Sequence, residues 1–279
     1  MKGKFMRRFY FFLMVCVAVF FCGCSHFSKP TANVADVTIQ NLSLEKITLG
    51  FDVDIQNPYF VALPLSNLKY ALSSGTSQFL AGDAKMQGTV PANGSKIINV
   101  PVEISFAPLF KALGQVKPGS VVPYQANMDL SVDAPGVGPM SLPIQKSGEL
   151  PVPDVPEVEI TEVKWSELSF NKATAKVHCK ILNKNDFPLE MTKFQYNLKL
   201  AGADVAQNTM ENPVDFPKGE SRNLEIPLSV SPISLGLAFY NILTGSGADY
   251  AFQGEMQIKT PFGMIPMPFQ KGGKTKFSK

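Results

Sequence analysis

Apolar and polar residues alternate along several short stretches of the chain, and this pattern is typical of β-strands with one buried face. Residues 49–55 and 175–181 show it most clearly, with an apolar side chain at every second position. Similar alternation occurs over 68–72, 98–104 and 124–132, and again over 194–198, 224–230 and 250–258. Pro, Gly and Asn residues favour turns between these stretches. The pattern predicts an all-β protein.

The whole arrangement occurs twice. Shifting the sequence by 126 residues aligns 37–135 with 163–261 without gaps and gives 20 identities in 99 positions. A repeat of this length indicates two similar domains rather than a solenoid of short units. We therefore predict two tandem immunoglobulin- or fibronectin-like antiparallel β-sandwiches, each with one short helix. The expected domains are 37–150 and 158–279, the second with a basic tail, joined by a proline-rich, semi-rigid linker over 151–157.

The two expected helices differ in polarity. Residues 107–116 have apolar side chains at helical spacing and polar ones between them, whereas 232–244 are apolar on most sides. A helix of the second kind is buried or contacts something apolar. We expect either burial against the first domain or a lid over a lipid-sized groove. The residues of this apolar groove or interface are Leu235, Leu237, Phe239 and Ile242.

The first 36 residues read as an export signal followed by a lipidated tether. A basic start precedes an apolar run of 13 residues, 9–21, which is too short to span a bilayer. Gly23-Cys24 then resembles the cleavage box of a bacterial lipoprotein signal. We expect 1–23 to be the signal peptide, Cys24 the lipid attachment site and 24–36 the tether. The alternative is an uncleaved hydrophobic anchor. Ser25 favours the outer membrane, with the body facing the periplasm.

Composition narrows the function classes. The net charge is +3, but four of the basic residues lie in the predicted signal, so the body is close to neutral, which excludes a nucleic-acid partner. Cys179 is the one cysteine outside the first 24 residues, and its position in an alternating stretch predicts a core role. The two histidines have no nucleophile or metal-ligand motif around them. We expect no enzyme activity, no metal and no cofactor.

Each half contains a recurring motif. A strand ends in Asn57-Pro58, an apolar stretch and a Tyr-containing strand at Tyr70 follow, and a glycine turn at Gly94 precedes Val100-Pro101-Val102. The second half keeps Asn183 but has Lys184 in place of the proline. In this pattern each half resembles a late embryogenesis abundant type 2 domain, also called the water stress and hypersensitive response domain. Independently of the family, Asn-Pro favours a turn at the strand end over a binding site.

The resemblance implies a function as well as a fold. It implies a fibronectin-like sandwich, no enzymatic chemistry and a binding or protective role linked to stress or desiccation. The alternative function is that of a lipid-binding or carrier protein with an apolar groove under the domain helices. The expected partners are the membrane, through lipidated Cys24, and a lipid or another envelope protein.

Overall fold

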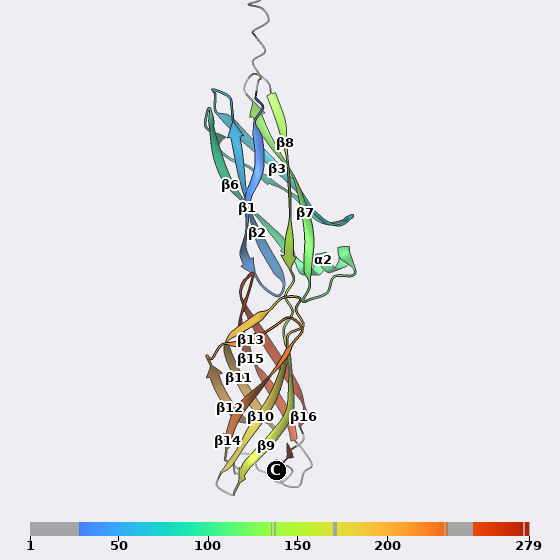
Figure 1. Cartoon of the computed structure of the whole chain (residues 1–279), viewed down its shortest axis with the longest axis vertical. Helices are drawn as coiled ribbons and strands as arrows, with labels where there is room; N and C mark the ends of the chain where they lie inside the picture. Colours follow the sequence, from blue (N-terminus) through green and yellow to red (C-terminus); the bar gives the residue numbers. More distant parts are fainter. Residues whose placement is uncertain are drawn as a thin grey trace, which may run out of the picture.

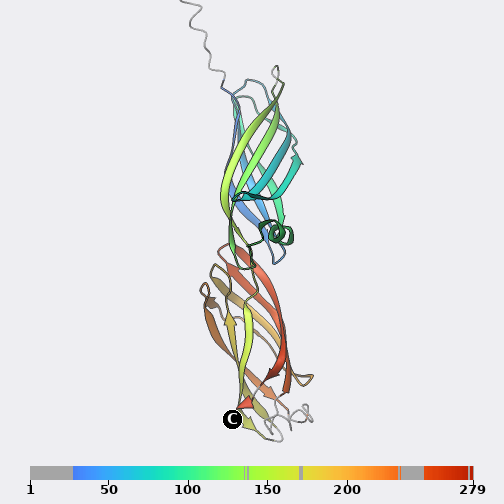
Figure 2. The ribbon, with the colours of Figure 1, turned by 90° about the vertical axis from the view of Figure 1, so that its right-hand side faces the viewer.

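The computed structural model describes residues 28–134, 136, 138–169, 172–231, 233, 248–275 and 277–278. Figures 1 and 2 show two β-domains stacked end to end along one long axis, with the first domain at the top. The prediction of two all-β sandwich domains is confirmed. The expected signal peptide and Cys24 lie outside the described residues, as does the second expected helix except for Ile233.

The first domain consists of two antiparallel sheets. One contains, in order, β1 (Thr31–Leu42), β2 (Lys46–Asn57) and β6 (Gly94–Ser105). The other contains β4 (Ser77–Lys85), β3 (Leu63–Ser74), β7 (Val121–Ala134) and β8 (Gly138–Pro151), with β5 (Thr89–Val90) paired to β3. Because side chains alternate along each strand, each sheet has an apolar inner face, and these inner faces pack together.

The second domain repeats this topology. Its first sheet is β14 (Ser221–Val230), β10 (Ala173–Leu182), β9 (Glu157–Leu168) and β17 (Phe277–Ser278). Its second sheet is β12 (Ala203–Met210), β11 (Leu189–Leu200), β15 (Ala248–Thr260) and β16 (Gly263–Thr275), with β13 (Val214–Phe216) paired to β11. Strands β9 and β11 begin and end 126 residues after β1 and β3, so the sequence repeat is also the structural repeat.

Each sandwich is held by apolar side chains from the alternating stretches. Phe51 is fully buried in the first domain, and its ring meets Tyr124 edge-on at 6.4 Å. In the second domain the rings of Phe194, Phe252 and Phe269 form a cluster, with the centroids of Phe252 and Phe269 6.0 and 5.4 Å from that of Phe194. Burying one such side chain contributes about 1.5–3 kcal/mol, so these alternating positions supply most of the stabilisation.

Helix α2 (Phe106–Leu113) follows β6 and lies at the end of the first domain that is nearer the second (Figure 1). Its inward residues Phe106 and Leu109 are 2% and 1% exposed, and it ends at Leu113, where Gly114 with a φ of +57° caps it. It covers most of the helix expected over 107–116. Within the described ranges, no helix is both long and apolar enough to cross a membrane.

Three segments differ from the sequence expectation. Strand β1 begins at Thr31, so the second half of the expected tether, 31–36, is paired to β2. In the expected linker, Pro151, Val152, Pro153 and Pro156 are buried, so this segment is packed between the domains rather than acting as an open spacer. The basic tail continues β16 as far as Thr275 and then forms β17, although the side chains of 271–274 remain exposed.

Candidate functional site

Asn57 lies at the end of β2 and is 2% exposed. Its Nδ2 donates to the carbonyl oxygens of Val61, Val90 and Pro91, at 2.8, 3.3 and 3.0 Å. Its Oδ1 accepts a hydrogen bond from the backbone N–H of Tyr59 at 3.0 Å. One buried side chain therefore fixes the loop 58–62 and ties it to the neighbouring turn at Pro91. We call this arrangement the asparagine clamp.

Asn183 forms the same clamp in the second domain. It is fully buried, and its Nδ2 donates to the carbonyl oxygens of Phe187, Phe216 and Pro217, at 2.9, 3.1 and 3.2 Å. Its Oδ1 accepts from the backbone N–H of Asn185 at 2.9 Å. Each partner is the repeat counterpart of a partner of Asn57. Because the clamp uses both ends of the amide internally, its role is to shape the loop that follows, not to hold a ligand.

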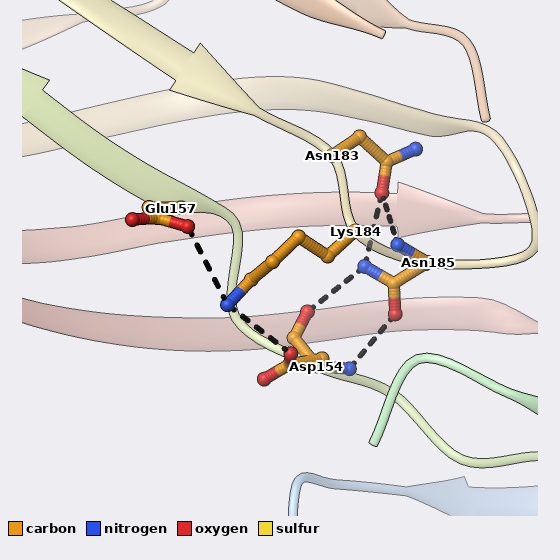
Figure 3. A network of polar contacts seen from close by, with 5 residues as sticks. All are labelled: Asp154, Glu157, Asn183, Lys184 and Asn185. Carbon is orange, nitrogen blue, oxygen red and sulfur yellow. Dashed lines mark hydrogen bonds and ion pairs between the residues drawn. The ribbon is translucent and has the colours of Figure 1, made fainter. Parts of the chain in front are cut away.

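The loop shaped by Asn183 docks onto the first domain. The backbone N–H of Asp186 donates to the carbonyl oxygen of Gly119 at 2.7 Å. The N–H of Gly119 in turn donates to the carbonyl oxygen of Val152 at 2.7 Å. Asn185 and Asp154 exchange two hydrogen bonds of 2.8 and 2.9 Å (Figure 3). A Cβ on Gly119 would lie 2.8 Å from the carbonyl oxygen of Lys184. The two backbones therefore meet where glycine alone fits.

Lys184 explains the departure from the Asn-Pro motif. Its Nζ lies 3.7 Å from a carboxylate oxygen of Asp154 and 3.7 Å from one of Glu157, both in or beside the linker (Figure 3). All three side chains are partly exposed, so each ion pair contributes little stability, at most about 1 kcal/mol. The contacts instead favour one position of the linker against the loop.

The outer face of the β12-β11-β15-β16 sheet carries a row of amides. Asn197 pairs in register with Gln207 on β12 and with Gln253 on β15, and Gln253 pairs with Gln270 on β16. Four strands thus each contribute one amide to a single row, at a strand spacing of about 4.8 Å. We call these four residues the amide row. They line a hollow of about 850 Å³ together with Gln195, Thr209 and Glu255.

The amide row is specific to the second domain. In the first domain the corresponding row is Ala81, Ala71, Asn127 and Gln145, so half of the amides are absent. Asn197 Oδ1 is shielded from solvent and accepts no hydrogen bond from any residue that the structure describes. A buried acceptor of this kind is costly unless a partner reaches it. The other three members, Gln207, Gln253 and Gln270, are exposed, so their amides can bond groups outside the protein.

His178 and Cys179 lie on opposite faces of β10. Cys179 is 1% exposed, and burial raises the pKa of its thiol to about 12, so it stays protonated as a core residue at neutral pH. His178 faces outward, with Nδ1 3.8 Å from a carboxylate oxygen of Glu225. The hydrogen bond from Lys176 holds the pKa of that carboxyl below its usual range. The two residues therefore cannot act as one catalytic pair.

The other site residues predicted from the sequence are Pro58, Cys24 and the four apolar residues of the second expected helix. Pro58 is exposed in the loop held by Asn57. Cys24, Leu235, Leu237, Phe239 and Ile242 lie outside the described residues. The inward residues of α2, Phe106 and Leu109, are buried in the core of the first domain, and the apolar groove under the helices stays a prediction. The sequence reasoning missed the docking loop and the amide row, although alternating Gln and Asn residues over 195–197 and at 253 could have pointed to the row.

Comparison with known proteins gives matches in both repeats. The model of the late embryogenesis abundant protein family (LEA_2) matches residues 52–148 and 178–273. A soybean (Glycine max) protein described as a desiccation protectant Lea14 homolog is 25% identical over 130 residues, which are 47% of this chain and 86% of that protein. The cotton (Gossypium hirsutum) late embryogenesis abundant protein Lea14-A is 25% identical over 134 residues, 48% of this chain and 89% of that protein.

A solved structure gives a weaker match. The solution structure of an Arabidopsis thaliana protein aligns with a TM-score of 0.38 and 24% identity, covering 46% of this chain and 84% of that one. The family model, in contrast, covers more than half of the chain and includes most strands of each sandwich. The chain therefore belongs to the late embryogenesis abundant family LEA_2, with two copies of the domain in tandem.

Proposed function

We propose that this protein is a non-enzymatic, lipid-anchored envelope protein that protects other molecules during drying or related stress. The stress role is supported by family membership and by the names of the soybean and cotton relatives. In this proposal lipidated Cys24 holds the chain at the outer membrane, with both domains in the periplasm. The structural observation that carries the protective role is the amide row on the second domain.

The amide row suits contact with surfaces that lose water. Each amide side chain offers two donor hydrogens and one acceptor oxygen, so the three exposed members of the row can bond donors and acceptors alike. Gln207, Gln253 and Gln270 are exposed, and the sheet fixes their spacing. Such a surface can replace the water-mediated hydrogen bonds that polar groups of a protein or a membrane lose on drying.

The amide row can be tested with purified protein. Gln207→Ala, Gln253→Ala and Gln270→Ala together should remove most of the protection that the chain gives to a desiccation-sensitive enzyme through drying and rehydration. The positions are exposed, so the melting temperature should stay close to that of the unchanged protein. Asn127→Ala with Gln145→Ala, on the corresponding row of the first domain, is the matched control. Equal loss in both variants, or none in the triple variant, would contradict the assignment.

The lipid anchor has its own test. Cys24→Ala should leave the signal uncleaved or release the protein, because acyl chains supply about 0.8 kcal/mol per buried methylene and several chains give stable anchoring. Metabolic labelling with a fatty acid and membrane fractionation measure the two effects. Ser25→Ala should keep the label and serves as the control. A label that survives Cys24→Ala would rule this residue out as the attachment site.

A further inference from the structure

The loop 58–62 of the first domain presents apolar side chains at a free end of the molecule. Phe60 is 79% exposed and Val61 is 37% exposed. The loop follows β2, whose last residues pair with the first residues of β1. It therefore lies at the end where the chain enters the first domain, at the top of Figure 1, away from the second domain. Because Phe60 and Val61 are adjacent, they form one small apolar patch rather than scattered exposed residues, and such patches mark contact surfaces.

The internal repeat shows what such a loop does when it has a partner. The counterpart of 58–62 is 184–188, the loop that docks onto the first domain through Asp186 and Asn185. Phe187, at the position of Val61, is 4% exposed and meets Phe262 of its own domain edge-on at 5.3 Å, whereas Val61 is 37% exposed. At the position of Asp186 the first domain has Phe60. The first domain therefore carries the docking loop with an apolar tip, and no domain in the described part of the chain covers it.

The asparagine clamp makes this tip a rigid one. The side chain of Asn57 donates to the carbonyl oxygens of Val61 and Pro91. The backbone N–H of Asn93 donates to the carbonyl oxygen of Tyr59 at 2.7 Å. Neither 58–62 nor 91–95 contains an acidic residue. The exposed Lys29 lines a hollow beside Pro58 at the same end. An apolar tip next to a lysine matches the interface of a bilayer, with acyl chains below and anionic headgroups around them.

The position of the tether selects the bilayer as the partner. Cys24 precedes Ser28, the first described residue, by four residues, so the two Cα atoms are at most about 14 Å apart. We propose that the loop 58–62 inserts Phe60 and Val61 into the membrane interface and so fixes how the two-domain body stands on the membrane. This inference rests on the proposed anchor at Cys24. Several acyl chains already retain the protein, so the loop sets orientation rather than attachment.

The experiment places a fluorescent side chain at the loop while the chain is held at Cys24. The protein is prepared as residues 24–279, which include every residue that the structure describes. The thiol of Cys24 is then coupled to a maleimide lipid in vesicles of phosphatidylcholine and phosphatidylglycerol. Cys179 does not compete, because it is buried and burial raises its pKa to about 12. In Phe60→Trp we expect a blue-shifted indole emission that lipids brominated high on the acyl chain quench strongly.

The controls separate insertion from mere proximity. Met264→Trp places an indole at a residue that is 51% exposed in the second domain, and buried Trp165 supplies the background in both variants. We expect no quenching at position 264. Equal quenching at both positions, or none at position 60, would overturn the inference. Coupling through maleimide makes this result independent of cellular acylation, so a missing lipid on Cys24 in the envelope would count against the anchor alone.

Discussion

Replacing Asn183 by alanine should lower the free energy of unfolding of the second domain by about 2–5 kcal/mol. The substitution removes the donor of three hydrogen bonds and leaves the carbonyl oxygens of Phe187, Phe216 and Pro217 without it. Phe187 and Phe216 are buried, so water reaches these carbonyls poorly. The loop 184–188 should also lose its shape, which weakens docking to the first domain. Chemical unfolding followed by the fluorescence of Trp165, the sole tryptophan, reports on the second domain.

Two further variants serve as comparisons for Asn183→Ala. Asn57→Ala should produce a loss of similar size in the first domain and leave the Trp165 transition nearly unchanged. Asn223→Ala removes an exposed asparagine from β14 and should cost less than about 0.5 kcal/mol. If Asn183→Ala were as mild as Asn223→Ala, the clamp would not be a stabilising element, and its recurrence in both repeats would need another explanation.

Substituting Gly119 by alanine should separate the two domains. Gly119 has a φ of +91°, which strains a residue with a Cβ, and the added carbon would lie 2.8 Å from the carbonyl oxygen of Lys184. The carbonyl oxygen belongs to the backbone and cannot turn aside as a flexible side chain would, so we expect the docking loop to move away. We expect a longer maximum dimension or greater flexibility in small-angle X-ray scattering, and faster proteolysis within 151–157.

Gly114→Ala is the matched control for this effect. Gly114 also has a positive φ, +57°, but apart from its two neighbours in the chain no residue comes within 4 Å of the place that a Cβ would take, so the change adds strain without a clash. It should cost about 1–3 kcal/mol in the first domain and leave the scattering profile unchanged. Identical scattering and proteolysis for the Gly119 and Gly114 variants would show that the junction does not depend on the close approach at Gly119.

The sequence predicted the sandwiches because their signal is local. Alternation over 49–55 and 175–181 directly reports one buried face, and the gapless repeat makes each half support the other. Strand β1 was missed for a physical reason. Its pairing with β2 shifts register between Val34 and Asp36 and again between Ile39 and Asn41, so the alternation breaks twice within twelve residues. A polar, irregular edge strand of this kind resembles a tether in sequence.

The junction and the amide row could not be predicted in the same way. Docking depends on Gly119 and Asp186, which are far apart in the sequence and interact through backbone atoms, so residue type carries almost no signal. The row at Asn197 and Gln253 depends on the register between strands, and register is fixed by packing across the whole sheet. Lys184 did mark the site, since the loss of the motif proline coincides with the loop that meets the linker.

The junction between the domains also determines how further domains could be added to such a protein in evolution. The two domains meet through different surfaces, the base of one and the tip loop of the other, which is a head-to-tail arrangement that does not close on itself. The sequence repeats Gly119 as Gly245, so the second copy retains the glycine that the contact requires. Further gene duplication could therefore lengthen the stalk in whole-domain steps, with each new unit using a joint that already exists and no core needing redesign.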